Sequence, residues 1–244
     1  MADSIVIIPT YNEIENIEKM IRKVFALNHP FDILVIDDGS PDGTATVVKT
    51  LQAEFPERLH LLERSGKQGL GTAYIAGFKW ALQYAYEYIF EMDADFSHNP
   101  DDLIRLKACV EESADVAIGS RYVSGVNVVN WPMSRVLLSY FASKYVRLIS
   151  GLTIHDTTAG FKCYRRQVLE TIDLNSIRFK GYAFQIEMKY TAYKCGFTLK
   201  EVPIIFINRM EGTSKMSSSI FGEALFGVFW LKWHSLFHKY PQKK

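Results

Sequence analysis

Short apolar runs alternate with stretches of helical periodicity along the first half of the chain, and this alternation restricts the fold more than any other feature. Residues 5–8 are continuously apolar, as in a strand buried on both faces of a parallel sheet. Residues 33–36 and 88–92 follow the same pattern, apart from Glu91. Apolar side chains then recur at helical spacing over residues 14–25. Strands that alternate with helices predict an α/β fold with a doubly wound, mostly parallel sheet flanked by helices.

The same patterns indicate the remaining elements. Further strands are expected at 58–62, 115–119 and 202–207, with a short strand after a turn at 157–162, and further helices at 44–53, 72–86, 101–112, 134–150 and 184–194. Pro203 has no N–H to donate to a ladder, which favours an edge strand or a strand start. Because the 244 residues show neither a repeat nor a linker, we expect one large domain with a C-terminal appendage.

Composition excludes several classes of protein. The net charge of +1 argues against a dedicated nucleic-acid binder, so no nucleic-acid partner is expected. Cys109, Cys163 and Cys195 are widely spaced and odd in number, which predicts buried thiols in a reducing compartment and neither a disulfide framework nor a zinc site. Neither a signal peptide nor an apolar run of about 18 residues is visible, which predicts a cytoplasmic protein.

Acidic residues follow two of the predicted strands. Asp93 and Asp95 come directly after the run at 88–92, and Asp37 and Asp38 come directly after the run at 33–36. Strand ends of this kind meet at the ligand-binding edge of an α/β sheet. Carboxylates suit Mg²⁺ or Mn²⁺, which usually sit on substrate phosphates. The two strand ends together indicate a nucleotide-sugar site, although an Asp-x-Asp motif alone is also common in solvated turns.

The glycine-rich segment 66–71 carries no specific nucleotide motif. It has neither the Walker pattern nor the Rossmann Gly-x-Gly-x-x-Gly. Its glycines allow close backbone approach to a ligand, and a simple turn explains them equally well.

Several segments, in a fixed order along the chain, resemble the family-2 glycosyltransferases of the GT-A, Rossmann-like fold, and within them the dolichyl- or polyprenyl-phosphate mannose synthases. The matching segments are residues 9–13, 37–44, 69–73, 92–100, 119–122, 158–162 and 209–215. The resemblance implies that mannose passes from GDP-mannose to a polyprenyl monophosphate, with Mg²⁺ or Mn²⁺ as cofactor.

The resemblance also implies roles for individual residues. It implies a nucleotide pocket of Pro9, Tyr11, Glu13 and Asp38, a metal site of Asp93, Asp95 and Ser97, an acceptor-phosphate site of Arg121, Arg135 and Ser139, and donor-diphosphate contacts from Arg209 and Lys215. The residues expected to matter most for catalysis are Asp95, Arg121, Arg135 and Arg209. Ser97 stands where the family often has Gln, which leaves the third protein ligand of the metal open.

Simpler explanations exist for some of these residues. Arg121 follows a strand and would equally suit a surface ion pair, and Arg135 would equally suit the solvated face of an amphipathic helix. Asp156 either orients the acceptor or caps a turn.

A phosphate acceptor is already anionic at neutral pH, so the expected reaction needs no general base. The metal would stabilise the departing nucleoside diphosphate. Arginine binds phosphate oxygens with a planar fork and stays protonated. These properties predict direct displacement at the anomeric carbon, with inversion.

The C-terminal segment offers a way for the enzyme to reach a lipid. We expect a glycosyltransferase domain over 1–216 and an amphipathic helix over 217–244 that lies in the membrane surface. The enzyme would then be peripheral, on the cytoplasmic face of a membrane. A helix packed on the domain or in a dimer is the alternative. Relatives of this kind carry C-terminal spans, depend on small membrane subunits or act alone, so a small subunit stays open as a partner.

Two other functions stay open on the sequence. A polyprenyl-phosphate transferase that uses a UDP-sugar, with glucose or N-acetylhexosamine, would need the same metal and acceptor residues. A membrane-recruited nucleotide-sugar binding protein without turnover would not need the acceptor arginines.

Overall fold

The computed structural model describes residues 2–208 and 219–243. Its strands are β1 (Ser4–Thr10), β2 (Asp32–Asp37), β3 (Leu59–Glu63), β4 (Tyr88–Glu91), β5 (Val116–Ser120), β6 (Val128–Val129), β7 (Lys162–Arg165), β8 (Leu199–Pro203) and β9 (Phe206–Ile207). Its helices are α1 (Ile17–Phe25), α2 (Thr44–Glu54), α3 (Leu70–Ala81), α4 (Asp102–Glu112), α5 (Met133–Ser150), α6 (Arg166–Thr171), α7 (Tyr182–Lys194) and α8 (Ser219–Phe237).

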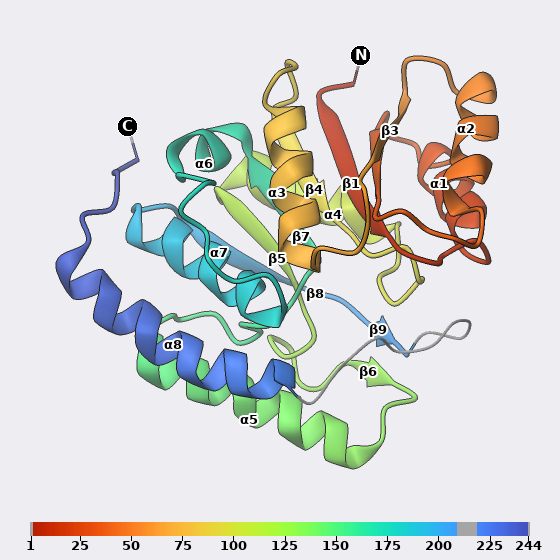
Figure 1. The fold of residues 1–244 in the computed structure, drawn as a ribbon. Coiled ribbons are helices and arrows are strands. Elements are labelled where there is room, and N and C mark those ends of the chain that lie inside the picture. Colours follow the sequence, from red (N-terminus) through yellow and green to blue (C-terminus); the bar gives the residue numbers. More distant parts are fainter. Residues whose placement is uncertain (1, 209–218, 244) are drawn as a thin grey trace.

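A seven-stranded sheet forms the centre of the molecule, in the order β3-β2-β1-β4-β7-β5-β8 (Figure 1). Every neighbouring pair in it is parallel except the two that involve β7, which runs antiparallel between β4 and β5. The predicted doubly wound, mostly parallel sheet is therefore confirmed. A separate two-stranded parallel sheet pairs β6 with β9.

Successive side chains of a strand point to opposite faces of the sheet, and β1 shows how this builds two cores. Ile5 and Ile7 belong to one buried cluster, with residues of α3, α5, α6, α7 and α8. Val6 and Ile8 belong to the other, with residues of α1, α2 and α4. Burial on both faces explains why these strands are continuously apolar in sequence.

Helix α3 begins and ends earlier than the expected range of 72–86. The observed helix runs from Leu70 to Ala81. After it, the Arg166 side chain donates hydrogen bonds to the carbonyl oxygens of Leu82 (2.8 Å), Tyr84 and Tyr86 (3.2 Å). The Arg166 guanidinium, 80 or more residues away in sequence, thus binds carbonyl oxygens that would accept hydrogen bonds within the helix if α3 were longer.

The strand expected at 202–207 is in fact two short strands. β8 ends at Pro203 and lies at the edge of the main sheet, so the edge position predicted for this proline is confirmed. The chain then leaves the main sheet and pairs with β6 through β9. The cysteine prediction is confirmed for Cys163 and Cys195, which are buried free thiols, whereas Cys109 is only partly buried.

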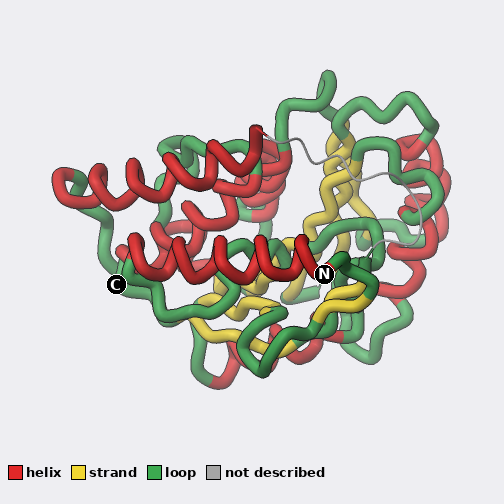
Figure 2. Tube along the Cα trace, turned by 90° about the horizontal axis from the view of Figure 1, so that it is seen from below, coloured by secondary structure: helices red, strands yellow, loops and turns green. Residues whose placement is uncertain are grey.

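Helices α5 and α8 lie side by side along one side of the molecule (Figures 1 and 2). The inner face of α8 packs on the domain through Gly227, Val228 and Leu231. A Cβ atom on Gly227 would lie only 2.8 Å from Cζ of Phe179, so the helix approaches this ring closely. The end of the described chain is also fixed, because Lys243 Nζ lies 2.8 Å from Asp115 Oδ2. Among the described helices, none combines the length and apolarity needed to cross a membrane.

Candidate active site

The predicted nucleotide residues gather where β1 and β2 end. Asp38 N donates to the Thr10 carbonyl oxygen at 3.0 Å, which holds the two strand ends together. Next to this contact, Tyr11 lies with its ring 5.3 Å from Lys67 Nζ, and the Glu13 amide donates to Thr44 Oγ1 at 3.1 Å. Pro9, Tyr11 and Glu13 are half-buried. The structure therefore brings these residues together at the edge of the sheet.

Asp38 is more constrained than the sequence indicates. Its carboxylate accepts hydrogen bonds from Arg64 Nε at 2.6 Å and from Arg64 Nη2 at 2.8 Å, and both side chains are about nine-tenths buried. Arg64 also donates to Thr72 Oγ1 at 3.0 Å. Sequence analysis missed Arg64, although it directly follows β3 and so emerges at the same edge as Asp37 and Asp38. This edge of the sheet therefore presents a carboxylate and a guanidinium together.

The two aspartates predicted to hold a metal follow β4. Asp93 is half-buried, and its Oδ1 accepts a hydrogen bond from the Tyr74 hydroxyl at 3.3 Å. Asp95 is buried, and its Oδ1 accepts from the Ser97 amide at 3.0 Å. Carboxylates oriented by hydrogen bonds fit Mg²⁺ or Mn²⁺. Within residues 2–208 and 219–243, no cluster of three His, Cys, Asp or Glu side chains forms a complete metal site. Substrate oxygens and water would have to complete the coordination.

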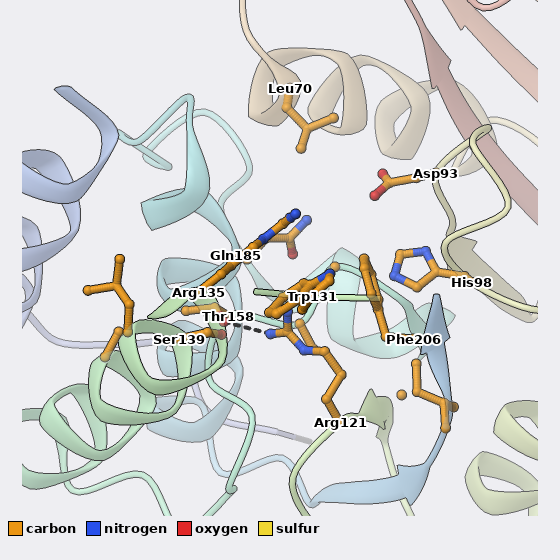
Figure 3. A pocket seen from close by; sticks show the side chains of 16 residues that line it. Leu70, Asp93, His98, Arg121, Trp131, Arg135, Ser139, Thr158, Gln185 and Phe206 are labelled. Carbon is orange, nitrogen blue, oxygen red and sulfur yellow. Dashed lines mark hydrogen bonds between the residues drawn. The ribbon is translucent and has the colours of Figure 1, made fainter. Parts of the chain in front are cut away.

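A cavity joins Asp93 to the predicted acceptor residues. Asp93, Arg121, Arg135 and Ser139 all line it, and Figure 3 shows them around one space together with His98, Trp131, Thr158, Gln185 and Phe206. Asp95 and Ser97 do not line this cavity. Sequence analysis did not select Trp131, Gln185 or Phe206, because nothing in their local sequence distinguishes them from ordinary core residues.

Arg121 is buried, so the explanation as a surface ion pair is wrong. Asp156 accepts hydrogen bonds from its Nε at 2.7 Å and its Nη2 at 2.6 Å, and Thr158 Oγ1 accepts from Nη2 at 2.8 Å. Burial opposes ionisation of Asp156, but the charge and hydrogen bonds of Arg121 outweigh it and hold the pKa of this carboxyl below its usual range. Asp156 is thus the partner of the arginine and not merely a turn cap.

Arg135 approaches the same cavity from α5. Its guanidinium carbon lies 4.0 Å from the centroid of the Trp131 ring, and its Nη1 donates to Asn208 Oδ1 at 3.1 Å. The side chain is therefore held over an aromatic face in the cavity wall and is not a solvated helix arginine. Ser139 lies one turn further along the same helix and lines the same cavity.

His98 is an ionisable side chain in the cavity wall that could take part in acid–base chemistry. It is buried against Phe161, with 4.9 Å between ring centroids, and its Nδ1 has no hydrogen-bond partner among the described residues. Burial lowers its pKa to about 4. The imidazole is consequently neutral at physiological pH and contributes no charge to the site.

Two predicted residues cannot be located. Arg209 and Lys215 lie outside the described residues, so their expected contacts with the donor diphosphate stay predictions.

Comparison with known proteins decides the family. The family model "Glycosyl transferase family 2" matches residues 5–173, more than half of the chain. The chain belongs to the family 2 glycosyltransferases. This glycosyltransferase is 50% identical in sequence to polyprenol monophosphomannose synthase of Mycolicibacterium smegmatis, over 92% of this chain and 85% of that protein. It is 47% identical to undecaprenyl-phosphate mannosyltransferase of Micrococcus luteus, over 91% and 90% of the two chains.

Solved structures of similar shape support the fold assignment. Glucosyl-3-phosphoglycerate synthase of Mycobacterium tuberculosis, in complex with Mn²⁺ and UDP, superposes with a TM-score of 0.66 over 94% of this chain and 79% of that one, at 15% identity. A mannosyltransferase of Pyrobaculum calidifontis, in complex with GDP-Man and Mn²⁺, gives 0.61 over 98% and 66%, at 18% identity. The expected GT-A-like fold is therefore confirmed.

Proposed function

We propose that this glycosyltransferase moves mannose from GDP-mannose to a polyprenyl monophosphate. The observation that carries the proposal is the convergence of Asp93, Arg121, Arg135 and Ser139 on one cavity. It joins a carboxylate suited to a cation on the donor diphosphate to two arginines suited to a second phosphate. Two relatives at 50% and 47% identity that carry mannosyltransferase names support the choice of sugar and acceptor.

On the donor side, Asp93 and Asp95 would hold Mg²⁺ or Mn²⁺, with Ser97 as a weaker candidate ligand. When bound, the cation neutralises charge that develops on the departing GDP. The Tyr74 hydroxyl keeps Asp93 oriented through its hydrogen bond. Tyr11 and the Asp38–Arg64 pair would contact the guanosine, because they lie at the neighbouring strand ends. Arg209 and Lys215 are proposed to reach the donor diphosphate.

On the acceptor side, Arg121 and Arg135 would bind the phosphate and partly neutralise it, with Ser139 donating a hydrogen bond. A phosphate oxygen attacks the anomeric carbon of mannose while the bond between that carbon and the GDP oxygen breaks. The configuration at this carbon therefore inverts. No proton has to leave the nucleophile, because the monoester is already anionic. This agrees with His98, whose pKa of about 4 makes it a poor base at neutral pH.

The enzyme must also meet a lipid, and we propose that α5 and α8 dock on a membrane. Both helices expose apolar side chains on their outer faces, and we call these residues the helix-pair surface: Leu137, Phe141 and Leu148 of α5 with Phe226, Phe229 and Trp233 of α8. Exposed Lys144, Lys232 and Lys239 flank it and suit anionic headgroups. Lys243 pairs with Asp115 and is not counted among them. We propose a peripheral protein on the cytoplasmic face.

A comparison of two acceptors, with and without the phosphate, tests this proposal. The purified chain is incubated with GDP-mannose, Mg²⁺ and either a polyprenyl phosphate or the corresponding polyprenol, and the lipid product is analysed by mass spectrometry. Mannosyl transfer to the phosphate alone is expected, because Arg121 and Arg135 supply positive charge that a phosphate can use and a neutral alcohol cannot. Equal transfer to the alcohol would contradict the proposal. Transfer by the purified chain alone would also show that no membrane subunit is required.

A further inference from the structure

The proposed acceptor arginine, Arg121, is held by a loop over residues 155–160, whose Thr158 and Ala159 line the cavity while Asp156 lies behind it. Asp156 is fully buried and binds the Nε and Nη2 edge of the guanidinium, as well as the Arg121 amide at 3.0 Å. The rings of Tyr122, Trp131 and Phe206 lie 5.3, 5.5 and 5.5 Å from the guanidinium carbon. The carboxylate and the rings together fix the orientation of this side chain in the cavity wall.

Glu201 on β8 holds the loop in turn. Its carboxylate accepts hydrogen bonds from the amides of His155 at 2.7 Å and Asp156 at 2.8 Å. Its side chain is only 7% exposed. Glu201 does not line the cavity and lies on the edge strand, so it acts on the backbone of the loop.

Lys189 of α7 holds the other end of the loop from inside the core. Its Nζ donates to the carbonyl oxygens of Thr157 at 3.0 Å, Ala159 at 2.6 Å and Gln185 at 3.2 Å. The side chain is fully buried. These carbonyl acceptors suit the N–H donors of the lysine amine. The lysine therefore draws the Thr157 and Ala159 carbonyls toward the core. Carbonyl oxygens that faced the cavity would repel an anionic acceptor.

We propose that Asp156, supported by Glu201 and Lys189, is the positioning residue that holds Arg121 for the acceptor phosphate. The inference rests on the proposed function and adds to it the residues that build the acceptor site. A buried ion pair is rarely more stabilising than apolar side chains of similar volume, so its stability alone does not explain it. A preset guanidinium, in contrast, spares the acceptor the cost of ordering a flexible arginine.

A double-mutant cycle tests the inference on the full-length enzyme. Asp156→Asn, Arg121→Lys and the double variant are compared for kcat/KM of polyprenyl phosphate at saturating GDP-mannose, and for the Kd of GDP. Asp156→Asn is expected to lower the acceptor kcat/KM by about 100-fold. The Kd of GDP should stay within about twofold of the wild-type value, because substitutions do not alter the energetics of a distant site with which they share no partners. The double variant should be no worse than the more damaged single variant.

Additive losses in the double variant would overturn the inference, and so would a wild-type acceptor kcat/KM or an equal loss of GDP affinity in Asp156→Asn. The wild-type rate separates failure of the proposed function from failure of the positioning role. An inactive wild-type enzyme contradicts the proposed function, whereas an active one makes the ratio between variants a test of positioning alone.

A second variant keeps the test valid if Asp156→Asn does not fold, which thermal unfolding reveals. Glu201→Gln keeps the size of its side chain and one acceptor oxygen, and it should lower the acceptor kcat/KM by about tenfold, as supporting residues commonly do. Glu170→Gln is the matched control, since Glu170 pairs with Arg166 on the surface and should leave both constants unchanged. An unchanged acceptor kcat/KM in folded Glu201→Gln would contradict the positioning role.

Discussion

At the scale of single residues, Asp93 joins the two halves of the site. It follows β4 next to the nucleotide residues at the ends of β1 and β2, and it also lines the cavity that holds Arg121 and Arg135. Under the proposed function, Asp93 would help to hold the cation on the donor side of this cavity, and the two arginines would hold the acceptor phosphate. The position of this one carboxylate would then let both substrates meet at the same strand end.

The metal assignment predicts the effect of removing Asp95. Asp95→Ala should lower the rate of mannosyl transfer by at least about 100-fold, because loss of a ligand should exceed the loss caused by its supporting residues. Asp101→Asn is the control, since the Asp101 side chain is half-exposed and pairs with Lys23 at the surface. The rates are measured over a titration of Mg²⁺. A fully active Asp95→Ala enzyme would show that the carboxylate holds no essential cation.

Sequence analysis was able to select many of these residues but not their partners. The acidic residues stand out because each directly follows an apolar strand, and strand ends form the ligand-binding edge. Arg64 is 26 residues from Asp38, and Asp156 is 35 residues from Arg121. Pairs at such separations depend on how the strands are ordered in the sheet, which local patterns do not reveal.

At the scale of elements, α3 rests on β1 at a position that only glycine fits. A Cβ atom on Gly77 would lie 2.7 Å from Cγ2 of Ile7, a branched side chain fixed in the sheet. Gly77→Ala would gain about 1 kcal/mol in helix propensity. Overpacking of a core costs about 1–3 kcal/mol, and this cost should dominate because Ile7 cannot move aside.

We therefore expect Gly77→Ala to lower the free energy of unfolding, measured by urea denaturation. Lys79→Ala, at an exposed position of the same helix, should change it by no more than about 0.5 kcal/mol. A Gly77→Ala protein more stable than the wild type would mean that helix propensity outweighs the contact with Ile7.

The helix-pair surface makes a second prediction at this scale. Leu148 and Trp233 are 82% and 67% exposed, so replacing each with Glu should leave the fold intact. Each replacement should weaken binding to anionic liposomes by about tenfold, because a large apolar side chain contributes about 1.5–3 kcal/mol when buried. Ile104→Glu on α4, where Ile104 is 40% exposed, is the control. Unchanged co-sedimentation of the Leu148→Glu/Trp233→Glu protein would contradict membrane docking by these helices.

The helical pattern of α8 was visible in the sequence, but its environment was not. One face of the helix packs on the domain through Gly227, Val228 and Leu231, while the opposite face exposes Phe226, Phe229 and Trp233. A helix with large apolar side chains on more than one face does not show in its sequence which of these faces is buried. The two interpretations left open by the sequence, packing on the domain and docking on a membrane, therefore concern different faces of one helix.

At the scale of the whole molecule, topology was only partly predictable. The strand–helix alternation predicts the parallel part of the sheet, because each crossover helix returns the chain to the same edge. The antiparallel insertion of β7 between β4 and β5 follows a long excursion through β6 and α5, where the alternation breaks down. The buried loop that holds Arg121 belongs to this less regular part of the chain.

Global stability should depend on pH through His98. The folded protein keeps this buried side chain neutral, with a pKa lowered from 6.5 to about 4 mainly by burial, whereas the unfolded chain protonates it near its ordinary pKa. The unfolded state thus binds more protons between these values, so stability falls as the pH drops through this range. The loss should reach about 3 kcal/mol near the folded pKa.

Urea denaturation of the metal-free protein at pH 7 and pH 4.5 checks this expectation. His98→Asn has no titrating ring, so its free energy of unfolding should fall less between the two pH values than that of the wild type. Equal losses in the two proteins would mean that other groups cause the pH dependence.

The central claim, transfer of mannose from GDP-mannose to a lipid phosphate, is tested most directly by the choice of donor. The purified protein is incubated with Mg²⁺ and a short polyprenyl phosphate, in one reaction with radiolabelled GDP-mannose and in another with radiolabelled UDP-glucose. Each reaction is then extracted into organic solvent. Label is expected in the organic phase from GDP-mannose only, and only when the metal is present. Label from UDP-glucose alone would contradict the assignment of mannose, and no label from either donor would contradict the proposed transfer itself.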